Sequence, residues 1–348
     1  MVKTAVFAVP GDIATPTGGY AYDRRIIAEL SVLGWQADVL SLGEGFPFPS
    51  AETRAAAGAR LAALPRQHPI VVDGLAFGAL PEAAQALRAS HRLIALVHHP
   101  LALETGLSAT DRAALHRSER SALACARHVI ATSTTSARLL AGDYTVPPDR
   151  LSVVEPGTDR VAARPREHAE EVVLLAVGAV IPRKGYDVLV AALARLAHLR
   201  WRLVIAGDGG RSPETFRRLA ADIETLDLAD RITLLGAVSS EQLASLYQRC
   251  DLFALPSRFE GYGMVFAEAI AHGLPVVGTT AGAIPQTVPD AASALVPPDD
   301  VEALAAALRR LIEDPAERER LSAAARAARF PSWREQGAAF ARLLENVA

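Results

Sequence analysis

The sequence has little cysteine and lacks the patterns typical of a disulfide scaffold or a zinc protein. Among its 348 residues only Cys125 and Cys250 are cysteines, and neither belongs to a CxxC or Cys/His motif. Structural zinc sites and redox-active dithiols require such motifs. Both cysteines lie in apolar, helix-like segments, so we expect buried structural thiols. Their scarcity fits a reducing compartment such as the cytoplasm.

Long apolar runs are missing too, as is a strong charge of either sign. No stretch of 18 apolar residues occurs, and the first apolar run, TAVFAVP, is too short for the core of a secretion signal. We therefore expect no transmembrane segment, and only peripheral membrane contact, for example at the inner face. The formal net charge is −3 and basic residues form no blocks, which argues against nucleic-acid binding.

The first half of the chain alternates short apolar runs with segments of helical period. The runs are TAVFAVP, ADVLSL, PIVVDGL, RLIALVHH, HVIATS and LSVVEPG. Most are continuous rather than alternating, which is typical of strands covered on both faces. Helical periodicity is found at residues 22–33, 51–64 and 111–126. The alternation predicts an α/β fold with a parallel sheet and right-handed crossovers.

The alternation lapses at residues 159–172, which are polar and contain Pro165, so we interpret this segment as a linker. It then resumes with the strand-like runs VVLLAVGAV, WRLVIAGDG, RITLLGAV, DLFALPS and LPVVGT. Helices are expected between them at residues 185–199, 213–226, 240–249, 264–272 and 301–313. The sequence thus predicts two Rossmann-like domains, residues 1–162 and 170–330, facing across a cleft. A last helical stretch follows Trp333, within residues 331–348.

The segment PSRFEGYGMVFAEAIAH, residues 256–272, carries the strongest chemical pattern. Glu260 and Glu268 lie eight residues apart, on either side of a glycine-rich turn that opens a helix near Met264. Backbone N–H groups at such a helix start bind anions. Carboxylates accept hydrogen bonds from vicinal diols, so a sugar and a ribose are natural partners. The alternative interpretation is an ordinary glycine turn followed by solvated glutamates.

A second pattern, AVGAVIPRKGYDVLVAAL, places a strand end at Gly178 and two adjacent cations, Arg183 and Lys184, in the following loop. Ligands bind parallel sheets at the carboxyl ends of strands. An arginine fork and a lysine point charge there can neutralise a diphosphate. The alternative is that both are ordinary surface cations.

Two further segments follow strands of the first domain. Gly18 and Gly19 precede the first expected helix and could let the backbone approach a phosphate closely. A plain loop and helix start explains them equally well. His98 and His99 end an apolar strand, so one should point into the cleft and the other away. The alternative is a structural histidine, and no further ligand at a fixed spacing indicates a metal site.

Together these motifs resemble the retaining glycosyltransferases of family 4, also called glycosyl transferases group 1, which have the GT-B fold. The resemblance is strongest over residues 172–298 and weaker in the N-terminal half. It rests on EGYG with its two glutamates after LPSRF, on VGAVIPRKGYDVL, and on GLPVVGTTAGAIPQTV followed by ALVPPDD. It implies transfer of a sugar from a nucleotide-diphosphate donor, UDP or GDP being the usual nucleotides, to an acceptor. It also implies that the last helix, within residues 331–348, crosses back to the first domain.

The resemblance also implies roles for the matching residues. Glu268 would bond the ribose hydroxyls, Glu260 would hold the transferred sugar, and His98, preferred to His99, would contact that sugar from the other domain. The diphosphate would be met by cations and by backbone around glycines and the helix start, namely Arg183, Lys184, Gly178, Gly18, Gly19, Gly261, Tyr262, Gly263 and Met264. We expect no metal or cofactor, since no Asp-x-Asp motif is present and the family's chemistry is metal-independent.

The sequence departs from the family pattern in three places and leaves the acceptor open. Pro156 stands where many members carry Asn, and Ala283 and Gln286 stand where Gly and Glu are usual. Loops near Asp12 and Tyr20 are expected on the acceptor side, but their residues do not indicate whether the acceptor is a sugar, a lipid or a small molecule. The segment 1–164 contains sixteen basic and fifteen acidic residues, and this net charge of +1 gives little electrostatic attraction to an anionic membrane. The oligomeric state is not readable from the sequence.

Three other functions are compatible with this architecture. An epimerase or phosphorylase would use the same sugar nucleotides or sugars, and a non-catalytic binding protein would keep the fold without turnover. The intact glutamates and cations argue against the binding protein. A dinucleotide dehydrogenase ranks last, because neither domain has the GxGxxG fingerprint after its first strand.

Overall fold

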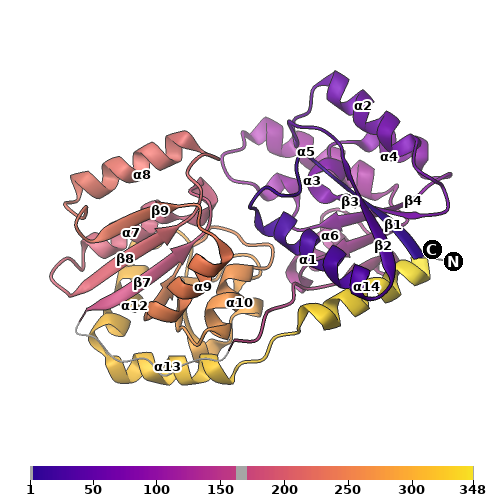
Figure 1. Cartoon of the computed structure of the whole chain (residues 1–348). Helices are drawn as coiled ribbons and strands as arrows, with labels where there is room; N and C mark the ends of the chain where they lie inside the picture. The colour runs from indigo at the N-terminus through magenta and orange to yellow at the C-terminus, as the bar shows by residue number, and fades with distance from the viewer. Residues whose placement is uncertain (1–2, 162–170, 348) are drawn as a thin grey trace. The chain divides into compact units, whose positions relative to one another are not determined.

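The structure is a computed structural model that describes residues 3–161 and 171–347. The chain forms two compact units, one of residues 1–157 with 331–348 and the other of residues 158–330. Each unit is built on its own six-stranded parallel sheet (Figure 1). In both halves of the chain the expected α/β class is confirmed.

The sheet of the first unit has the strand order β2-β1-β3-β4-β5-β6. Its strands are β1 (Lys3–Val9), β2 (Trp35–Ser41), β3 (Pro69–Asp73), β4 (Arg92–Val97), β5 (His128–Ala131) and β6 (Leu151–Val153). The central strands β3 and β4 are buried almost throughout, whereas β2 at the edge is largely exposed. The chain moves one way from β1 to β2 and the other way from β3 onward, so the strand order reverses between β1 and β3. Ligands of doubly wound sheets bind at such a reversal.

Helices connect these strands and cover the sheet. They are α1 (Gly18–Val32), α2 (Ala51–Ala62), α3 (Gly74–Phe77), α4 (Pro81–Leu87), α5 (Ala109–Leu123) and α6 (Thr134–Gly142), with short 3-10 turns η1 (Leu101–Leu103) and η2 (Pro148–Arg150). Their starts follow sequence rules for capping. Thr17, Ser50, Ser108 and Ser133 each accept a hydrogen bond from a backbone N–H in the first turn of the helix that they cap.

The second unit repeats the plan with the order β12-β11-β10-β7-β8-β9. Its strands are β7 (Val172–Val177), β8 (Trp201–Ala206), β9 (Ile232–Gly236), β10 (Leu252–Ala254), β11 (Val276–Thr279) and β12 (Ser293–Val296). The order reverses between β7 and β10. One large apolar core, which includes Leu174, Leu189, Leu203 and Phe253, lies between this sheet and its helices.

The helices of the second unit are α7 (Tyr186–Ala194), α8 (Pro213–Thr225), α9 (Ser240–Arg249), α10 (Met264–Ala271), α11 (Ile284–Thr287), α12 (Val301–Glu313) and α13 (Pro315–Ala327), with 3-10 turns η3 (Pro182–Lys184) and η4 (Asp290–Ala292). The bounds expected for α9 and α12 are confirmed. Helix α13 was not expected. Pro315 is the first residue of α13, where its missing N–H costs nothing, and Asp314 caps the helix.

Three sequence-based expectations were wrong in detail. Helix α1 begins at Gly18 rather than Tyr22, so the glycine pair forms its first turn instead of a loop before it. Helix α7 ends at Ala194, five residues before the expected Leu199. Cys250 is buried as expected, but Cys125 is only half-buried and its Sγ lies 3.1 Å from Gln85 Oε1. Most of the expected linker, residues 162–170, lies outside the described residues.

The last helix, α14 (Trp333–Val347), belongs to the first unit although it follows the second unit in the chain. Figure 1 shows this yellow helix beside the indigo α1. Phe340 stacks on Phe7 of β1 with ring centroids 5.8 Å apart, and a Cβ on Gly337 would come within 2.3 Å of Glu29 Cβ. The helix thus closes the core of the first sheet. None of the helices within the described ranges combines the length and apolar character that crossing a bilayer requires.

We expect Phe340→Ala to lower the free energy of unfolding of the first unit by about 3–5 kcal/mol, because Phe340 is fully buried and its loss leaves a cavity. Urea unfolding followed by tryptophan fluorescence in a Trp201→Phe background measures this, since both remaining tryptophans then lie in the first unit. Arg342→Ala, an exposed change on the same helix, is the control. Equal midpoints for the two variants would contradict this packing.

Candidate functional site

The main candidate site of the second unit lies where the strand order reverses. Strand β10 pairs in parallel with β7, so the loops after the two strands leave the same edge of the sheet. Turn η3 after β7 carries Arg183 and Lys184, and the loop after β10 carries Glu260. Residues 76 positions apart in sequence are thereby brought into contact, as their places at strand ends predict.

Glu260 is the centre of this cluster. Its Oε1 lies 2.7 Å from Lys184 Nζ and accepts a hydrogen bond of 2.7 Å from the Ser257 hydroxyl. Its Oε2 lies 3.3 Å from Arg183 Nη1, which also donates to the Phe259 carbonyl at 2.9 Å. Ser257, Lys184 and Glu260 are all buried. The two expected phosphate-binding cations and the expected sugar-binding glutamate therefore form one buried ionic group.

The charge balance of this group favours ionised Glu260. Burial alone would raise the pKa of the carboxyl group, but the positive charges of Lys184 and Arg183 and the hydrogen bonds from Lys184 and Ser257 outweigh it. The pKa of Glu260 is lowered from 4.5 to about 2. At neutral pH the glutamate is an acceptor of hydrogen bonds and has no proton to give. This suits a residue that binds hydroxyl groups better than one that acts as an acid.

Gly178 leaves room for the lysine of this group. A Cβ built on Gly178 would lie 2.9 Å from Lys184 Cε, and the backbone there has φ of 147°. Its carbonyl accepts a hydrogen bond of 2.6 Å from the hydroxyl of Tyr186, at the start of α7. The structure thus gives Gly178 a packing role, in addition to the ligand contact expected for it.

The glycine-rich turn leads directly into α10. Gly263 has φ of 94° and precedes Met264, the first helical residue, while Tyr262 is buried and its carbonyl accepts a hydrogen bond from Thr287. Gly261 is half-buried at the start of this turn. The turn thus has the backbone of a helix start that the sequence predicted.

Glu268 lies one turn into α10 and has a fixed side chain. Its Oε2 accepts a hydrogen bond of 3.0 Å from the hydroxyl of buried Tyr247 on α9. The ring of Tyr247 stacks on His272 with centroids 4.8 Å apart. Sequence reasoning missed Tyr247, which sits in an ordinary amphipathic helix. No spacing links it to Glu268.

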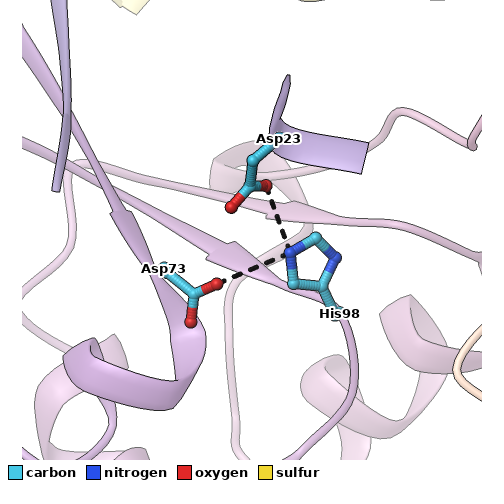
Figure 2. Close-up of side chains that lie close together, drawn as sticks. All are labelled: Asp23, Asp73 and His98. Carbon is cyan, nitrogen blue, oxygen red and sulfur yellow. Dashed lines mark ion pairs between the residues drawn. The ribbon is translucent and has the colours of Figure 1, made fainter. Parts of the chain in front are cut away.

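In the first unit the glycine pair and His98 lie next to each other. A Cβ on Gly19 would approach the His98 ring to 3.0 Å, so a larger residue would require the ring to shift by a few tenths of an ångström, whereas Gly18 has open space around it. His98 follows β4 and contacts the carboxylates of Asp23 and Asp73 (Figure 2). Sequence reasoning missed both aspartates. Asp73 is the last residue of β3, and His98 directly follows the neighbouring strand β4. Their places at the same edge of the sheet could have predicted that these two residues lie close together.

The remaining candidates of the first unit differ in exposure. Asp12 is exposed and caps its own loop by accepting the N–H of Ala14 at 2.8 Å. Tyr20 is 9% exposed, and its hydroxyl donates to the Pro10 carbonyl. Tyr20 therefore shapes the loop from within more than it offers a surface. His99 Nε2 lies 3.4 Å from Glu104 Oε2, away from the residues that contact His98.

A buried acid supports the segment that follows the two histidines. Glu119 on α5 is 1% exposed, and its Oε2 accepts the N–H of Leu101 at 2.9 Å. Burial raises the pKa of Glu119 from 4.5 to about 8, although the hydrogen bonds from Leu101 and Tyr144 lower it in part. The group is thus held protonated at neutral pH. Sequence reasoning did not single it out, because it lies in a polar helix.

The family of the chain follows from comparison with known proteins. Residues 159–328 match Glycosyl transferases group 1, and residues 45–161 match Glycosyltransferase Family 4. The chain belongs to the group 1 glycosyltransferases of family 4. The resemblance seen in the sequence is confirmed.

Relatives and solved structures agree with this assignment. The D-inositol 3-phosphate glycosyltransferase of Nocardioides sp. is 35% identical over 241 residues, which are 62% of this chain and 52% of the relative. The MMP alpha-(1->4)-mannosyltransferase of Mycolicibacterium hassiacum is 30% identical over 274 residues, 73% of this chain and 65% of the relative. The chain spans about half the length of the inositol-phosphate relative.

Two solved structures share the fold. Sucrose-phosphate synthase from Thermosynechococcus elongatus superposes with a TM-score of 0.81 at 23% identity and covers 99% of both chains. HepE of Anabaena, solved in complex with UDP-glucose, has a TM-score of 0.77 at 19% identity and covers 98% of this chain and 99% of its own. The expected GT-B fold class is confirmed by this likeness.

The pKa of Glu260 predicts how the second unit responds to acid. Because the folded pKa is depressed, this carboxylate contributes stability above about pH 4.5 that is lost as the pH falls toward 2. Between pH 4.5 and 2 the wild type loses this contribution, whereas Glu260→Gln has no carboxyl group to lose it from. We therefore expect the free energy of unfolding to decrease by about 3 kcal/mol less in Glu260→Gln than in the wild type. Urea unfolding in a Trp35→Phe, Trp333→Phe background reports on the second unit through Trp201.

The exposed Glu214→Gln on α8 is the control for this comparison and should keep the wild-type slope. Parallel stability curves for wild type and Glu260→Gln between pH 4.5 and 2 would show that the ionic group does not hold Glu260 as described.

Glu119 predicts the opposite dependence for the first unit. Its folded pKa is raised, so the stability it contributes is full below about pH 4.5 and is lost as the pH rises through 8. We expect Glu119→Gln to flatten the decline in unfolding free energy between pH 5 and 8.5, since glutamine stays neutral and still accepts the N–H of Leu101. Exposed Glu52→Gln on α2 should leave the decline as in the wild type. An unchanged slope in Glu119→Gln would refute the raised pKa.

Proposed function

We propose that this chain is a retaining, metal-independent glycosyltransferase that moves a sugar from a nucleotide-diphosphate donor, a UDP-sugar or GDP-sugar, to an acceptor. The observation that carries the proposal is the buried group of Arg183, Lys184 and Glu260 beside the glycine-rich start of α10. Membership of the family and a HepE structure that contains UDP-glucose support it. We propose no resident cofactor.

The roles follow from the chemistry of each group. Arg183 and Lys184 would face the diphosphate, and the amides near Met264, with the backbone of Gly18 and Gly19 from the first unit, would add hydrogen bonds. Negative charge grows on the diphosphate as the bond to the sugar breaks, and fixed positive groups stabilise that charge. Because Lys184 is already buried and held, little reorganisation is needed when the charge appears.

Glu260 would hold hydroxyl groups of the sugar, and its low pKa keeps it a hydrogen-bond acceptor at the working pH. Glu268 would accept hydrogen bonds from the ribose, with Tyr247 fixing its carboxylate. His98 would contact the transferred sugar. In the retaining reaction the acceptor hydroxyl would attack from the face that the diphosphate leaves and would pass its proton to that phosphate. None of these steps requires a protein nucleophile.

The acceptor stays open in this proposal. Relatives are named for D-inositol 3-phosphate and for transfer of a mannosyl group, and these names belong to those proteins. We place the acceptor on the side of Asp12 and Tyr20, with peripheral membrane contact allowed. A cytoplasmic location is also proposed, on the scarcity of cysteine.

The first test is a melting-temperature scan with UDP, GDP, ADP and NAD, followed by assays for transfer from the matching sugar nucleotides. A ligand at 100 times its dissociation constant stabilises the folded state by about 2.7 kcal/mol. We expect UDP or GDP to raise the melting temperature, and NAD to leave it unchanged. A shift with NAD alone, or with none of the four, would overturn the proposal.

The second test changes the cations. Arg183→Ala with Lys184→Ala should weaken binding of the stabilising nucleotide by at least about 100-fold and abolish transfer, because charge-assisted hydrogen bonds contribute about 1.5–3 kcal/mol each. The pair Arg217→Ala with Arg218→Ala removes the same charge from exposed positions of α8 and should bind normally. A third variant adds Glu260→Gln to the first pair, so that no lone buried carboxylate destabilises the unit. Near-normal nucleotide affinity in both site variants would refute the assigned role.

A further inference from the structure

Three side chains from three elements meet at the strand reversal of the first unit. Asp23 comes from α1, Asp73 ends β3, and His98 follows β4. Nε2 of His98 lies 3.2 Å from Asp23 Oδ1 and 3.6 Å from Asp73 Oδ2 (Figure 2). The sequence separates these residues by 50 and 25 positions, and the sheet brings them together.

Both carboxylates are buried, and that of Asp23 has no contact that would stabilise its charge other than the one with His98. Asp73 is 4% exposed, and its Oδ1 accepts the N–H of Leu75 at 2.7 Å as the cap of α3, so only Oδ2 faces the histidine. Asp23 is fully buried, and its two oxygens have no hydrogen-bond partner among the described residues; Oδ1 meets His98 Nε2 only as an ion pair at 3.2 Å. Two buried carboxylates whose oxygens lie within 4.8 Å of each other repel unless one of them takes up a proton or a positive charge lies between them.

The groups around His98 leave the imidazole as the source of that charge. The ring packs against the backbone at Gly19 and against the edge of Tyr22, whose ring centroid is 5.4 Å away. Burial and the negative charge of Asp23 raise the pKa of Tyr22 well above 10, so Tyr22 is neutral. Among the described residues the charged groups that face the ring are therefore Asp23 and Asp73.

The orientation of the His98 ring determines which of its nitrogen atoms can contact a ligand. Figure 2 shows the second ring nitrogen of His98 directed away from both carboxylates. A neutral ring with its proton on Nε2 would offer Nδ1 as a hydrogen-bond acceptor, whereas a protonated ring offers an N–H donor there. The protonation state of His98 thus decides which kind of ligand atom it can bind.

We propose that Asp23 and Asp73 are positioning residues that keep His98 as an imidazolium, with Nε2–H held between their carboxylates and Nδ1–H presented to an oxygen of the bound sugar nucleotide. The inference rests on the proposed function for the identity of the ligand. The charge state of His98 is independent of it. A cationic His98 would bind a hydroxyl or phosphate oxygen and would oppose the negative charge that develops in the reaction.

The pKa shifts agree with this geometry. Burial lowers the pKa of His98, but the negative charge and close contact of Asp23, together with the charge of Asp73, raise it above 6.5 overall. Burial and the charge of Asp23 raise the pKa of Asp73 to about 7, against the opposing effects of His98 and the Leu75 N–H, so Asp73 is mostly ionised at pH 7.5 and loses its charge below about pH 7. Removing either carboxylate takes away part of what holds the proton on the ring.

The test is a pH titration of the histidine ring nitrogens by NMR on the full chain labelled with ¹⁵N-histidine. The chain has nine histidines, and the signals missing from His98→Gln identify His98. We expect both ring nitrogens of His98 to be protonated at pH 7.5 in the wild type. Asp23→Asn and Asp73→Asn should each move the titration down by at least about one pH unit, a tenfold loss in proton affinity.

Matched variants keep the test interpretable. Asparagine at position 73 still caps α3, so this variant should fold even if Asp23→Asn does not. Glu104→Gln removes the carboxylate beside His99 and should leave the titration of His98 unchanged. A neutral His98 at pH 7.5 in the wild type, or the same His98 titration in Asp73→Asn as in the wild type, would overturn the proposal. Stoichiometric binding of added Zn²⁺ or Mn²⁺ with loss of the Nε2 proton would overturn it too.

Kinetics separate this inference from the proposed function. If sugar transfer is found, Asp73→Asn should lower kcat at least about tenfold at pH 7.5 with a smaller change in KM, and the loss should shrink at lower pH as His98 regains its proton. A pH-independent loss would indicate a merely structural role and overturn the inference. If no sugar nucleotide supports transfer while His98 titrates as expected, the proposed function fails and the charged histidine stands.

Discussion

The second unit depends on a buried carboxylate that cannot remain charged alone. Glu260 is 6% exposed, and an isolated ionised carboxyl group in such surroundings costs several kcal/mol. Lys184, Arg183 and the Ser257 hydroxyl offset this cost, and to do so the loops after β7 and β10 must lie side by side. The ionic group therefore stabilises the relative placement of two loops, and these loops carry the residues proposed to bind the donor.

Much of this arrangement was predictable, because strands and the residues that follow them can be recognised from short segments of the sequence. Apolar runs identified eleven of the twelve strands of the two sheets, all but β12, and Lys184 and Glu260 could be assigned to one sheet edge from their places after strands. The partnership of Asp23 with His98 was not predictable. Asp23 lies inside a helix, and its meeting with a strand end depends on how α1 packs on the sheet, which leaves no fixed spacing in the sequence.

Glycine misled the reasoning in one place and helped it in another. Gly18 and Gly19 predicted a loop, since glycine is a poor helix former, but Thr17 caps the helix at this point and Gly19 packs closely against the His98 ring. Gly263 behaved as expected, since a left-handed residue before α10 is a position that glycine favours. Packing against a distant side chain overrode local propensity in the first case, and local backbone geometry decided the second.

The return of α14 to the first unit affects the order in which the chain can fold during synthesis. Phe7 leaves the ribosome early, whereas its stacking partner Phe340 emerges only after the whole second unit has been made. Every residue of the second unit precedes Phe340 in the chain and leaves the ribosome before it. Until then Phe7 and the side of α1 that α14 contacts stay uncovered, which leaves this part of the nascent chain open to chaperones and to misassembly.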